Sequence, residues 1–369
     1  MLPTFHINRW LLPLAWLYGG VMEIRNWLFD KGYFKTVSFE EQVPVICVGN
    51  ISAGGTAKTP HVEYLVQLLQ SEGIGPVAVL SRGYKRRSNG FQLAEPASTV
   101  AQLGDEPYQI YRKFSNAIVA VCESRAKGIR ELLALPTPPA VIILDDAMQH
   151  RWLSPGFTIC LTSYSRILYK DYLLPAGRLR EPAANIQRAD MVIITKCPAS
   201  LRKEDQTEIT GNLPTSIEQP IYFTQFKYEQ LVNLATLEPQ AVDPRCNVLM
   251  VCGIADPSSM EEVIQTHYRL LDKLIFPDHH NFSAKDIREI RHRMENIVND
   301  GLNPDTGLKP VVITTEKDAM RLMRHRAVDD ELKARIFFLP AHVAFISKKH
   351  EQNFKNRILN YVRKNQKHC

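Results

Sequence analysis

The sequence predicts an α/β protein of two domains, each built on a parallel β-sheet with helices on both faces. The chain has 369 residues, and a domain averages about 150 residues. Short apolar runs alternate with polar stretches of helical length from about residue 43 onward. This alternation is typical of strands buried in a parallel sheet and of the helices that connect them. A polar, proline-containing stretch separates two such series.

Each apolar run is predicted to be a strand because turn residues or a helix-forming stretch follow it. The first series comprises Val43–Val48, Pro76–Leu80, Ala117–Cys122, Val141–Leu144, Phe157–Leu161 and Met191–Thr195. The second comprises Val248–Cys252, Leu271–Phe276, Val311–Thr315 and Ile336–Leu339. Between them we expect a helix and loop over 198–220, an exposed or edge strand at Ile221–Phe226 and a connector over 236–247. The basic tail from Lys348 is predicted to be a partly solvated packing helix.

Composition places the chain among ordinary globular proteins. Hydrophobic residues make up 45% and charged residues 23%, which excludes disordered and collagen-like chains. The net charge of +6 is small for a nucleic-acid-binding protein, so we expect no nucleic-acid partner, but it suits an anionic substrate or membrane surface. The seven cysteines include no C-x-x-C pair. They indicate buried thiols in a reducing compartment rather than a zinc site or disulfides.

The N-terminal segment Trp10–Phe29 is rich in large apolar residues. Its uninterrupted apolar part ends at Met22, which is short of the about 20 residues that a spanning helix needs. No small-x-small cleavage site follows, which argues against a signal peptide. Three of the four tryptophans lie here, and tryptophan favours the membrane interface. As a helix, the segment either lies in a bilayer surface or is buried against the next domain.

The strongest chemical signal follows the first predicted strand. The sequence VGNISAGGTAKTP places glycines before a Lys-Thr pair, namely Gly49, Gly54, Gly55, Lys58 and Thr59. Such a loop binds phosphate through backbone N–H groups, the positive end of a helix and the lysine charge. The usual GxxxxGK[ST] spacing requires glycine where Ser52 and Ala57 stand. The alternative is an ordinary glycine-rich turn, and Ala57 fits well only if its φ is that of a right-handed helix.

Carboxylates follow two other predicted elements. Asp145 and Asp146 come directly after the apolar run VIIL, as in strands whose tip carboxylate holds Mg²⁺ beside a phosphate loop. Asp105 and Glu106 precede an amphipathic helix. They are either an N-cap and an acidic first turn, or a catalytic base and a metal-side carboxylate that face the terminal phosphate.

Histidines and arginines near strand ends are further candidates. His279 and His280 follow a strand of the second series, where they indicate proton or metal chemistry or are surface residues. Arg82, Arg178 and Arg180 also lie near strand ends, and guanidinium groups either recognise phosphate or pair with surface carboxylates. The sequence contains no GxSxG, HExxH or GxGxxG motif, so hydrolase, zinc-protease and dinucleotide-binding functions lack support.

Taken together, these segments resemble the tetraacyldisaccharide 4'-kinase family, the lipid A 4'-kinases of Gram-negative bacteria. The resemblance rests on the apolar N-terminal helix and, in order, on VGNISAGGTAKTP, SRGY, GDEP, LDDAMQH, LLPAGRLREP, ADMVIITK, FPDHHNF and TTEKDA. They extend from residue 9 to about residue 320 and cover most of the chain. Their combination is more specific than any one of them.

The resemblance implies a P-loop NTPase-type α/β/α sandwich, a second, smaller α/β/α domain and an N-terminal membrane-surface helix. The expected division is an amphipathic helix over 1–30, the kinase domain over 31–220, the second domain with a two-stranded linker over 221–346, and a basic helix over 347–369. The linker strands are expected near 221–227 and 336–345.

The implied reaction is ATP-dependent. It transfers the γ-phosphoryl group of ATP, with Mg²⁺, to the 4'-hydroxyl of a lipid-linked tetraacyldisaccharide 1-phosphate in lipid A biosynthesis. The resemblance also implies that residues 9–29 attach the protein peripherally to the cytoplasmic face of the inner membrane.

The resemblance further implies roles for individual residues. The expected ATP-binding set is Gly49, Asn50, Ser52, Ala53, Gly54, Gly55, Thr56, Ala57, Lys58 and Thr59. The expected metal-side residues are Thr59, Asp145, Asp146 and Glu106. Asp105 resembles the catalytic base, supported by a histidine that best matches His279, and Lys58 resembles the catalytic lysine. The expected substrate-facing residues are Arg125, Gln149, His150 and Arg178. Ala57 departs from the glycine that precedes the lysine in the family.

Two other classes of function fit the same loop. A P-loop switch or chaperone-type NTPase would hydrolyse nucleotide without a lipid acceptor. A non-enzymatic membrane adaptor with an altered loop would bind no ATP. Measuring ATP consumption with and without the acceptor separates the three.

Overall fold

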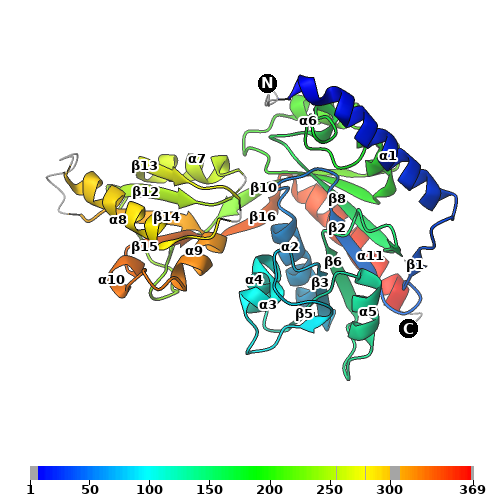
Figure 1. Ribbon diagram of the computed structural model, residues 1–369, viewed down its shortest axis with the longest axis horizontal. Coiled ribbons are helices and arrows are strands. Elements are labelled where there is room, and N and C mark those ends of the chain that lie inside the picture. The colour runs from blue at the N-terminus through cyan, green and yellow to red at the C-terminus, as the bar shows by residue number, and fades with distance from the viewer. Residues whose placement is uncertain (1–6, 255, 279, 300–307, 367–369) are drawn as a thin grey trace. The chain divides into compact units, whose positions relative to one another are not determined.

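A computed structural model describes residues 7–254, 256–278, 280–299 and 308–366 (Figure 1). The chain forms two compact units, one of Met1–Gln225 with Val343–Cys369 and one of Phe226–His342. Each unit is an α/β structure around its own sheet, as the sequence predicts. The division into four segments expected above is finer and stays a prediction.

The larger sheet has nine strands in the order β16-β10-β9-β8-β2-β6-β3-β5-β4. These strands are β2 (Val45–Gly49), β3 (Val77–Ser81), β4 (Gln92–Leu93), β5 (Ala117–Val121), β6 (Val141–Asp145), β8 (Phe157–Ser163), β9 (Met191–Thr195), β10 (Ile221–Tyr228) and β16 (Ala341–Phe345). A separate parallel pair joins β1 (Val37–Ser38) to β7 (Leu153–Ser154). The helices of this unit are η1 (Arg9–Leu11), α1 (Leu12–Asp30), α2 (Lys58–Ser71), α3 (Val100–Leu103), α4 (Asp105–Lys113), α5 (Arg125–Leu133), η2 (Leu168–Lys170), η3 (Ala183–Arg188), α6 (Lys203–Asn212) and α11 (Lys348–Gln366).

The nine-stranded sheet differs from the prediction in two respects. It is mixed rather than wholly parallel, because β4 pairs antiparallel with β5. The two-residue β4 has no apolar run that a sequence pattern can detect. The expected edge position of Ile221–Phe226 was wrong, because β10 lies between β9 and β16 and its residues 222–224 are buried. The strand β16, which covers this edge, comes more than 110 residues later in the chain.

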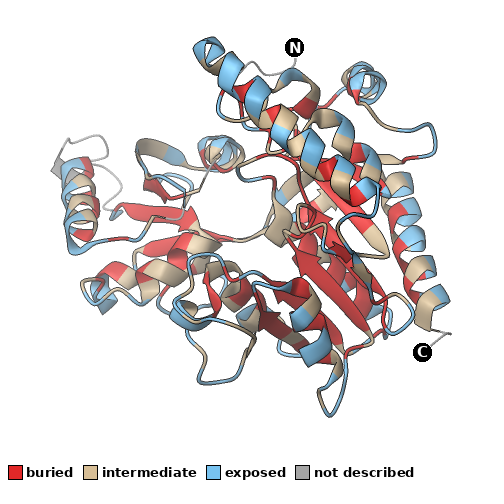
Figure 2. Cartoon of the chain, turned by 45° about the vertical axis from the view of Figure 1, so that its right-hand side comes forward, coloured by how far each residue is buried: buried red, intermediate tan, exposed pale blue. Residues whose placement is uncertain are grey.

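Two hydrophobic cores cover the two faces of this sheet (Figure 2). Along β2, Val45 and Cys47 belong to the core that α5 and α6 complete, whereas Ile46 and Val48 belong to the core of α2, α4 and α11. The predicted C-terminal packing helix is confirmed, since α11 buries its apolar stripe in the second core: Phe354, Ile358, Leu359 and Val362. Alternation of side chains about a twice-covered sheet explains the nearly continuous apolar runs.

The second unit has a five-stranded sheet in the order β11-β15-β14-β12-β13. Its strands are β11 (Val232–Asn233), β12 (Asn247–Cys252), β13 (Arg269–Ile275), β14 (Val311–Thr315) and β15 (Ile336–Leu339), and its helices are α7 (Ser258–His267), α8 (Ala284–Asn299), α9 (Glu316–Met323) and α10 (Asp330–Lys333). All four predicted strands are present. The sheet is also mixed, because β11 pairs antiparallel with β15. One core includes α8, α9 and α10 and the other includes α7.

The described cysteines are buried, as the sequence predicts. Six cysteines in the described residues are free and buried: Cys47, Cys122, Cys160, Cys197, Cys246 and Cys252. Burial raises the pKa of Cys47 to about 12, so its thiol stays protonated at neutral pH and packs as a small apolar group.

The helix α1 has the opposite polarity to an ordinary surface helix. Its buried residues are Ala15, Gly19, Asn26 and Phe29, and a Cβ on Gly19 would lie 2.7 Å from Leu173 Cδ1, so a larger residue would require the Leu173 side chain to move. Its large apolar residues are exposed instead: Trp10 by 94%, Trp16 by 70% and Leu17 by 68%, with Leu14, Val21, Ile24 and Trp27 beside them. Burial against the rest of the protein therefore applies to the side that carries small and polar residues together with Phe29. Among the described helices, none combines the length and apolar character needed to cross a bilayer.

Candidate active site

The predicted phosphate loop joins β2 to α2 and is held by backbone hydrogen bonds. Ala53 N donates to the Arg178 carbonyl over 2.7 Å, and Arg180 N donates to the Ile51 carbonyl over 2.8 Å. Gly54 and Gly55 at the tip of the loop are exposed. The loop is therefore fixed at its base by the segment 178–180 and open at its tip, where a phosphate group needs access to backbone N–H groups.

Two buried polar residues fix the inside of the loop. Asn50 Nδ2 donates to Thr56 Oγ1 over 2.8 Å, and Thr195 Oγ1 at the end of β9 donates to the Thr56 carbonyl over 3.2 Å. All three side chains belong to buried residues. Hydrogen bonds of this kind are directional, so they define the loop conformation before any ligand binds.

Ala57 has the left-handed conformation that the sequence analysis identified as unfavourable. Its φ is 61° and its ψ is 36°, and α2 begins at the next residue, Lys58. The His61 ring nitrogen Nδ1 lies 2.8 Å from the Ala57 carbonyl, and Nε2 lies 3.1 Å from Thr224 Oγ1. Burial lowers the pKa of His61 to about 4, so a neutral ring with one donor holds this turn. The surrounding bonds thus impose a conformation that favours glycine.

A charged cluster lies at the carboxyl end of the sheet. Lys58 Nζ is 3.6 Å from Asp146 Oδ1, and Arg180 Nη1 is 3.7 Å from Asp146 Oδ2. Parallel pairing of β2 with β6 sets Val48 opposite Asp145, which brings the acidic strand end beside the phosphate loop. The structure therefore brings Lys58 and the two aspartates together, as the sequence predicts.

Asp145 is buried among acidic groups. It is 1% exposed, and its Oδ2 accepts a hydrogen bond of 3.4 Å from Ser81 Oγ. Burial, followed by the charges of Glu106 and Asp146, raises the pKa of Asp145 to about 7. Its carboxyl group is therefore poised between protonated and ionised forms near neutral pH.

Asp105 and Glu106 form the first turn of α4, and both are half-buried. The N-cap of this helix is Gly104, at a φ of 90°, so the N-cap alternative for Asp105 was wrong. A Cβ on Gly104 would lie 3.1 Å from the Tyr84 carbonyl oxygen, so both this tight contact and the positive φ favour glycine. Gly104 lies against Tyr84, which follows the end of β3, and β3 runs parallel to β6, so this helix start lies at the same end of the sheet as the phosphate loop.

The four predicted substrate residues lie in different environments. Arg178 is exposed, and its Nη1 lies 3.4 Å from where a Cβ on Gly54 would stand, so its guanidinium borders the phosphate loop. Arg125 is 2% exposed and donates to the backbone carbonyls of Cys122 and Glu123 over 2.9 and 3.3 Å. Arg125 Nη2 also lies 3.4 Å from the Asp145 carbonyl. In this structure Arg125 therefore braces strand ends rather than presenting an open guanidinium.

Gln149 and His150 follow the acidic pair in a loop near α1. Gln149 Nε2 donates to the Asn50 carbonyl, and the Gln149 carbonyl accepts from Arg25 of α1. His150 is half-buried, and burial followed by the charges of three arginines lowers its pKa: Arg125, Arg82 and Arg25. This electropositive surrounding suits an anionic substrate group.

Of the two histidines that the sequence singles out in the second unit, only His280 lies in the described part of the chain. His279 lies outside the described residues. His280 stacks on Phe276 with ring centroids 4.4 Å apart, and its Nε2 lies 3.0 Å from Asp286 Oδ2. His280 thus packs within the second unit. Within the described ranges, no group of three or more His, Cys, Asp or Glu is arranged to hold a metal ion.

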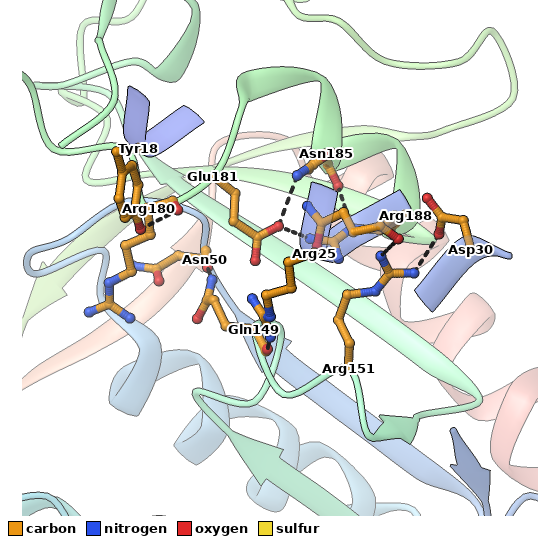
Figure 3. Close-up of polar contacts among 11 residues, drawn as sticks. Tyr18, Arg25, Asp30, Asn50, Gln149, Arg151, Arg180, Glu181, Asn185 and Arg188 are labelled. Carbon is orange, nitrogen blue, oxygen red and sulfur yellow. Dashed lines mark hydrogen bonds and ion pairs between the residues drawn. The ribbon is translucent and has the colours of Figure 1, made fainter. Parts of the chain in front are cut away.

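Sequence reasoning missed three residues next to this site, namely Tyr18, Arg25 and Glu181, which Figure 3 shows together with Arg180. Arg180 contacts Asp146, and the neighbouring Glu181 is 0% exposed and accepts from Asn185 and Arg188. Tyr18 and Arg25 of α1 donate to the carbonyls of Arg180 and Gln149. The segment LLPAGRLREP was noted for its arginines. The contacts of Tyr18 and Arg25 could not be predicted, because the sequence of an apolar helix does not show which segment its few polar residues will contact in the fold.

The fold and the site together define a phosphotransferase of the phosphate-loop kinase class. A braced glycine-rich loop, its lysine and two aspartates at one end of a largely parallel sheet are the parts that phosphoryl transfer requires. The family described as Tetraacyldisaccharide-1-P 4'-kinase matches residues 7–363. The chain belongs to that family, which confirms the kinase predicted from the sequence.

Full-length relatives agree with this family. The chain is 42% identical to the tetraacyldisaccharide 4'-kinase of Bacteroides thetaiotaomicron over 97% of this chain and 94% of that protein. It is 43% identical to the same enzyme of Bacteroides fragilis over 98% and 95% of the two chains. A crystal structure of LpxK from Aquifex aeolicus in complex with ATP matches with a TM-score of 0.69 and 30% identity, over 96% of this chain and 99% of that one.

Ala57→Gly is expected to stabilise the protein by about 0.5–1 kcal/mol. A left-handed conformation costs an L-residue about 1–2 kcal/mol, and glycine removes this cost. Glycine also has more conformational freedom in the unfolded state, which cancels roughly half of the gain. Urea denaturation measures the difference. Ala53→Gly in the same loop is the matched control, because Ala53 has no positive φ, and it should destabilise the protein. The same sign for both variants would contradict this account.

Asp145→Asn is expected to stabilise the protein, more at high pH than at low pH. The carboxyl group ionises with a pKa of 3.8 when unfolded and about 7 when folded, so its ionisation destabilises the fold progressively as pH rises from about 4 to 7. The gain from asparagine should be about 2 kcal/mol larger at pH 8 than at pH 5, measured without nucleotide or Mg²⁺. Asp330→Asn, at a side chain that is 97% exposed, is the control. A gain independent of pH would refute the raised pKa.

Proposed function

We propose how this member of the tetraacyldisaccharide 4'-kinase family performs its reaction in lipid A biosynthesis. The γ-phosphoryl group of ATP is transferred to the 4'-hydroxyl of a tetraacyldisaccharide 1-phosphate. The observation that carries the mechanism is the pairing of Lys58 with Asp146 at the end of a phosphate loop that is braced from both sides. The complex of the Aquifex aeolicus relative with ATP supports the nucleotide.

The phosphate loop and Lys58 are proposed to hold the β- and γ-phosphates. The exposed Gly54 and Gly55 offer backbone N–H groups, and the start of α2 adds positive partial charge. Arg178 borders Gly54, so we propose that it contacts the phosphate chain rather than the sugar. Arg180 and Lys58 then keep the site electropositive once Asp146 turns to a metal ion.

The acidic residues fit Mg²⁺. One carboxylate oxygen each of Asp145 and Asp146 is buried without a hydrogen-bond partner in the described structure, and both carboxylates lie at the strand end beside the loop. Because no three carboxylates in the described ranges are arranged to bind one ion together, we propose that Asp146, Asp145, Glu106 and the Thr59 hydroxyl hold it in part through water. Bound Mg²⁺ neutralises charge on the phosphates during transfer.

Asp105 is proposed as the general base. Its place in the first turn of α4, beside Glu106, puts it at the same end of the sheet as Lys58. As the 4'-oxygen forms its bond to the γ-phosphorus, the bond from that phosphorus to the bridging oxygen of ADP breaks, and the hydroxyl proton passes to the Asp105 carboxylate. The supporting role of His279 stays a prediction, as do the sugar contacts of Gln149 and His150.

The exposed apolar face of α1 is proposed to lie in the cytoplasmic surface of the inner membrane, through residues 9–29. Exposed tryptophans at Trp10, Trp16 and Trp27 favour an interface over bulk water. A lipid acceptor also resides in that membrane, so an enzyme attached to its surface meets the substrate without extracting it.

ATP consumption is expected to depend on the lipid acceptor. Incubation with ATP, Mg²⁺ and a tetraacyldisaccharide 1-phosphate in detergent should yield ADP and a bisphosphorylated lipid in equal amounts, whereas omission of the acceptor should lower ADP formation at least about 100-fold, because the acceptor oxygen completes the reacting set. Equal ADP formation without acceptor would favour a nucleotide-hydrolysing switch, and no nucleotide binding would favour an adaptor.

Asp105→Ala is expected to lower kcat by about two orders of magnitude or more, the scale of general base catalysis. The KM for ATP should change little, because Asp105 acts on the acceptor hydroxyl. Steady-state kinetics with varied ATP measures both constants. Asp330→Ala, on an exposed helix of the second unit, is the control and should retain full activity. Near-normal turnover of Asp105→Ala would remove this residue from the role.

The double variant Leu17→Glu, Val21→Glu is expected to weaken vesicle binding at least about tenfold, since each buried apolar side chain contributes about 1.5–3 kcal/mol. Both side chains are more than half exposed, so the thermal unfolding midpoint should stay unchanged. Co-sedimentation with phospholipid vesicles measures binding. Ile217→Glu, at a fully exposed apolar residue far from α1 in the chain, is the matched control. Undiminished binding of the double variant would place the attachment elsewhere.

A further inference from the structure

A chain of hydrogen bonds joins α1 to the interior of the phosphate loop, and Figure 3 shows its members Arg25, Gln149 and Asn50. Arg25 Nη2 donates to the Gln149 carbonyl over 2.7 Å. The side-chain amide of Gln149 donates to the Asn50 carbonyl. Asn50 Nδ2 in turn donates to Thr56 Oγ1 over 2.8 Å. Three successive bonds thus connect the inner face of the helix to a buried residue of the loop.

A second connection reaches the other flank of the loop. Tyr18 Oη donates to the Arg180 carbonyl over 2.8 Å, and Arg180 N donates to the Ile51 carbonyl over 2.8 Å. The guanidinium of Arg180 lies 3.7 Å from Asp146, the ion-pair partner of Lys58. Tyr18 therefore holds the segment that braces the phosphate loop and carries one of its cations.

The C-terminal end of α1 is fastened in the same polar manner. Arg151 Nη1 donates to the Asn26 carbonyl over 2.9 Å, Nη2 lies 2.6 Å from Asp30 Oδ1, and the guanidinium lies 5.0 Å from the centroid of the Phe29 ring. Apart from Phe29, the large apolar residues Ile24 and Trp27 in this part of the helix are exposed. The position of α1 thus depends on directional bonds, which weaken steeply when donor and acceptor shift.

We propose that Tyr18 and Arg25 are positioning residues that couple the seating of α1 on a phospholipid surface to the geometry of the phosphate loop. ATP then binds more tightly when the helix is docked on the membrane. This proposal rests on the membrane contact of α1 proposed above. Because coupling between two binding events is reciprocal, ATP must also tighten binding to vesicles by the same factor.

The test uses the full chain and vesicles of phosphatidylethanolamine and phosphatidylglycerol that contain no acceptor lipid. Fluorescence of the α1 tryptophans reports vesicle binding, and calorimetry with ATP and Mg²⁺ gives the nucleotide Kd with and without vesicles. We expect a Kd at least about fivefold lower on vesicles, and vesicle binding tightened equally by ATP.

In the kinase assay, Tyr18→Phe and Arg25→Gln should raise the KM for ATP several-fold with kcat nearly unchanged, and Arg25→Lys should partly restore the KM.

Two matched variants separate coupling from a general loss of structure. Tyr33→Phe makes the same chemical change at an exposed tyrosine just beyond α1, and Arg269→Gln removes an exposed arginine of the second unit. Both variants should keep the wild-type coupling. The double variant Tyr18→Phe, Arg25→Gln should still bind vesicles normally, but its Kd for ATP should be the same with and without vesicles.

The outcomes distinguish this proposal from the function on which it rests. Vesicle binding and kinase activity with equal ATP affinity on and off vesicles in the wild-type chain would overturn the coupling and leave the function standing. Coupling that persists in the combined variant would overturn the role of Tyr18 and Arg25. A chain that does not bind vesicles at all would overturn both the coupling and the membrane contact.

Discussion

Parallel pairing of β2 with β6 is the constraint on which the site depends. Because the two strands run in the same direction, the phosphate loop and the acidic pair emerge at one end of the sheet, with Val48 opposite Asp145. Neither segment alone defines a nucleotide site. The loop obtains its shape from Asn50 and from the segment 178–180, and the acidic pair obtains its lysine from the loop.

The same arrangement is costly to the fold. A buried Asp145 beside Glu106 and Asp146 and a left-handed Ala57 both oppose stability. The surrounding hydrogen bonds, from Thr195 to the loop and from Arg125 to the strand ends, maintain the conformation regardless. A strained backbone and closely gathered carboxylates at one end of the sheet are what a site awaiting an ionic ligand requires.

The helix α1 inverts the usual rule for packing on a protein surface. Small and polar residues and Phe29 face the protein, whereas the tryptophans, Leu14 and Leu17 face outward. This inversion unites two properties in one element: an apolar surface for lipid, and polar contacts through Tyr18 and Arg25 to the flanks of the phosphate loop. A helix that was buried through its apolar face would offer neither.

The sequence by itself determined the α/β class, the long strands, the phosphate loop with Lys58, and the carboxylates at Asp145 and Asp146, because apolar periodicity and strand-end chemistry are local. Only the tertiary structure decided that β10 is internal, that Arg125 is buried and that Arg180 joins the site. These depend on segments far apart in the chain, such as β16, whose arrival beside β10 leaves no mark in the nearby sequence. The φ of Ala57 and the inward face of α1 likewise follow from neighbours rather than from residue type.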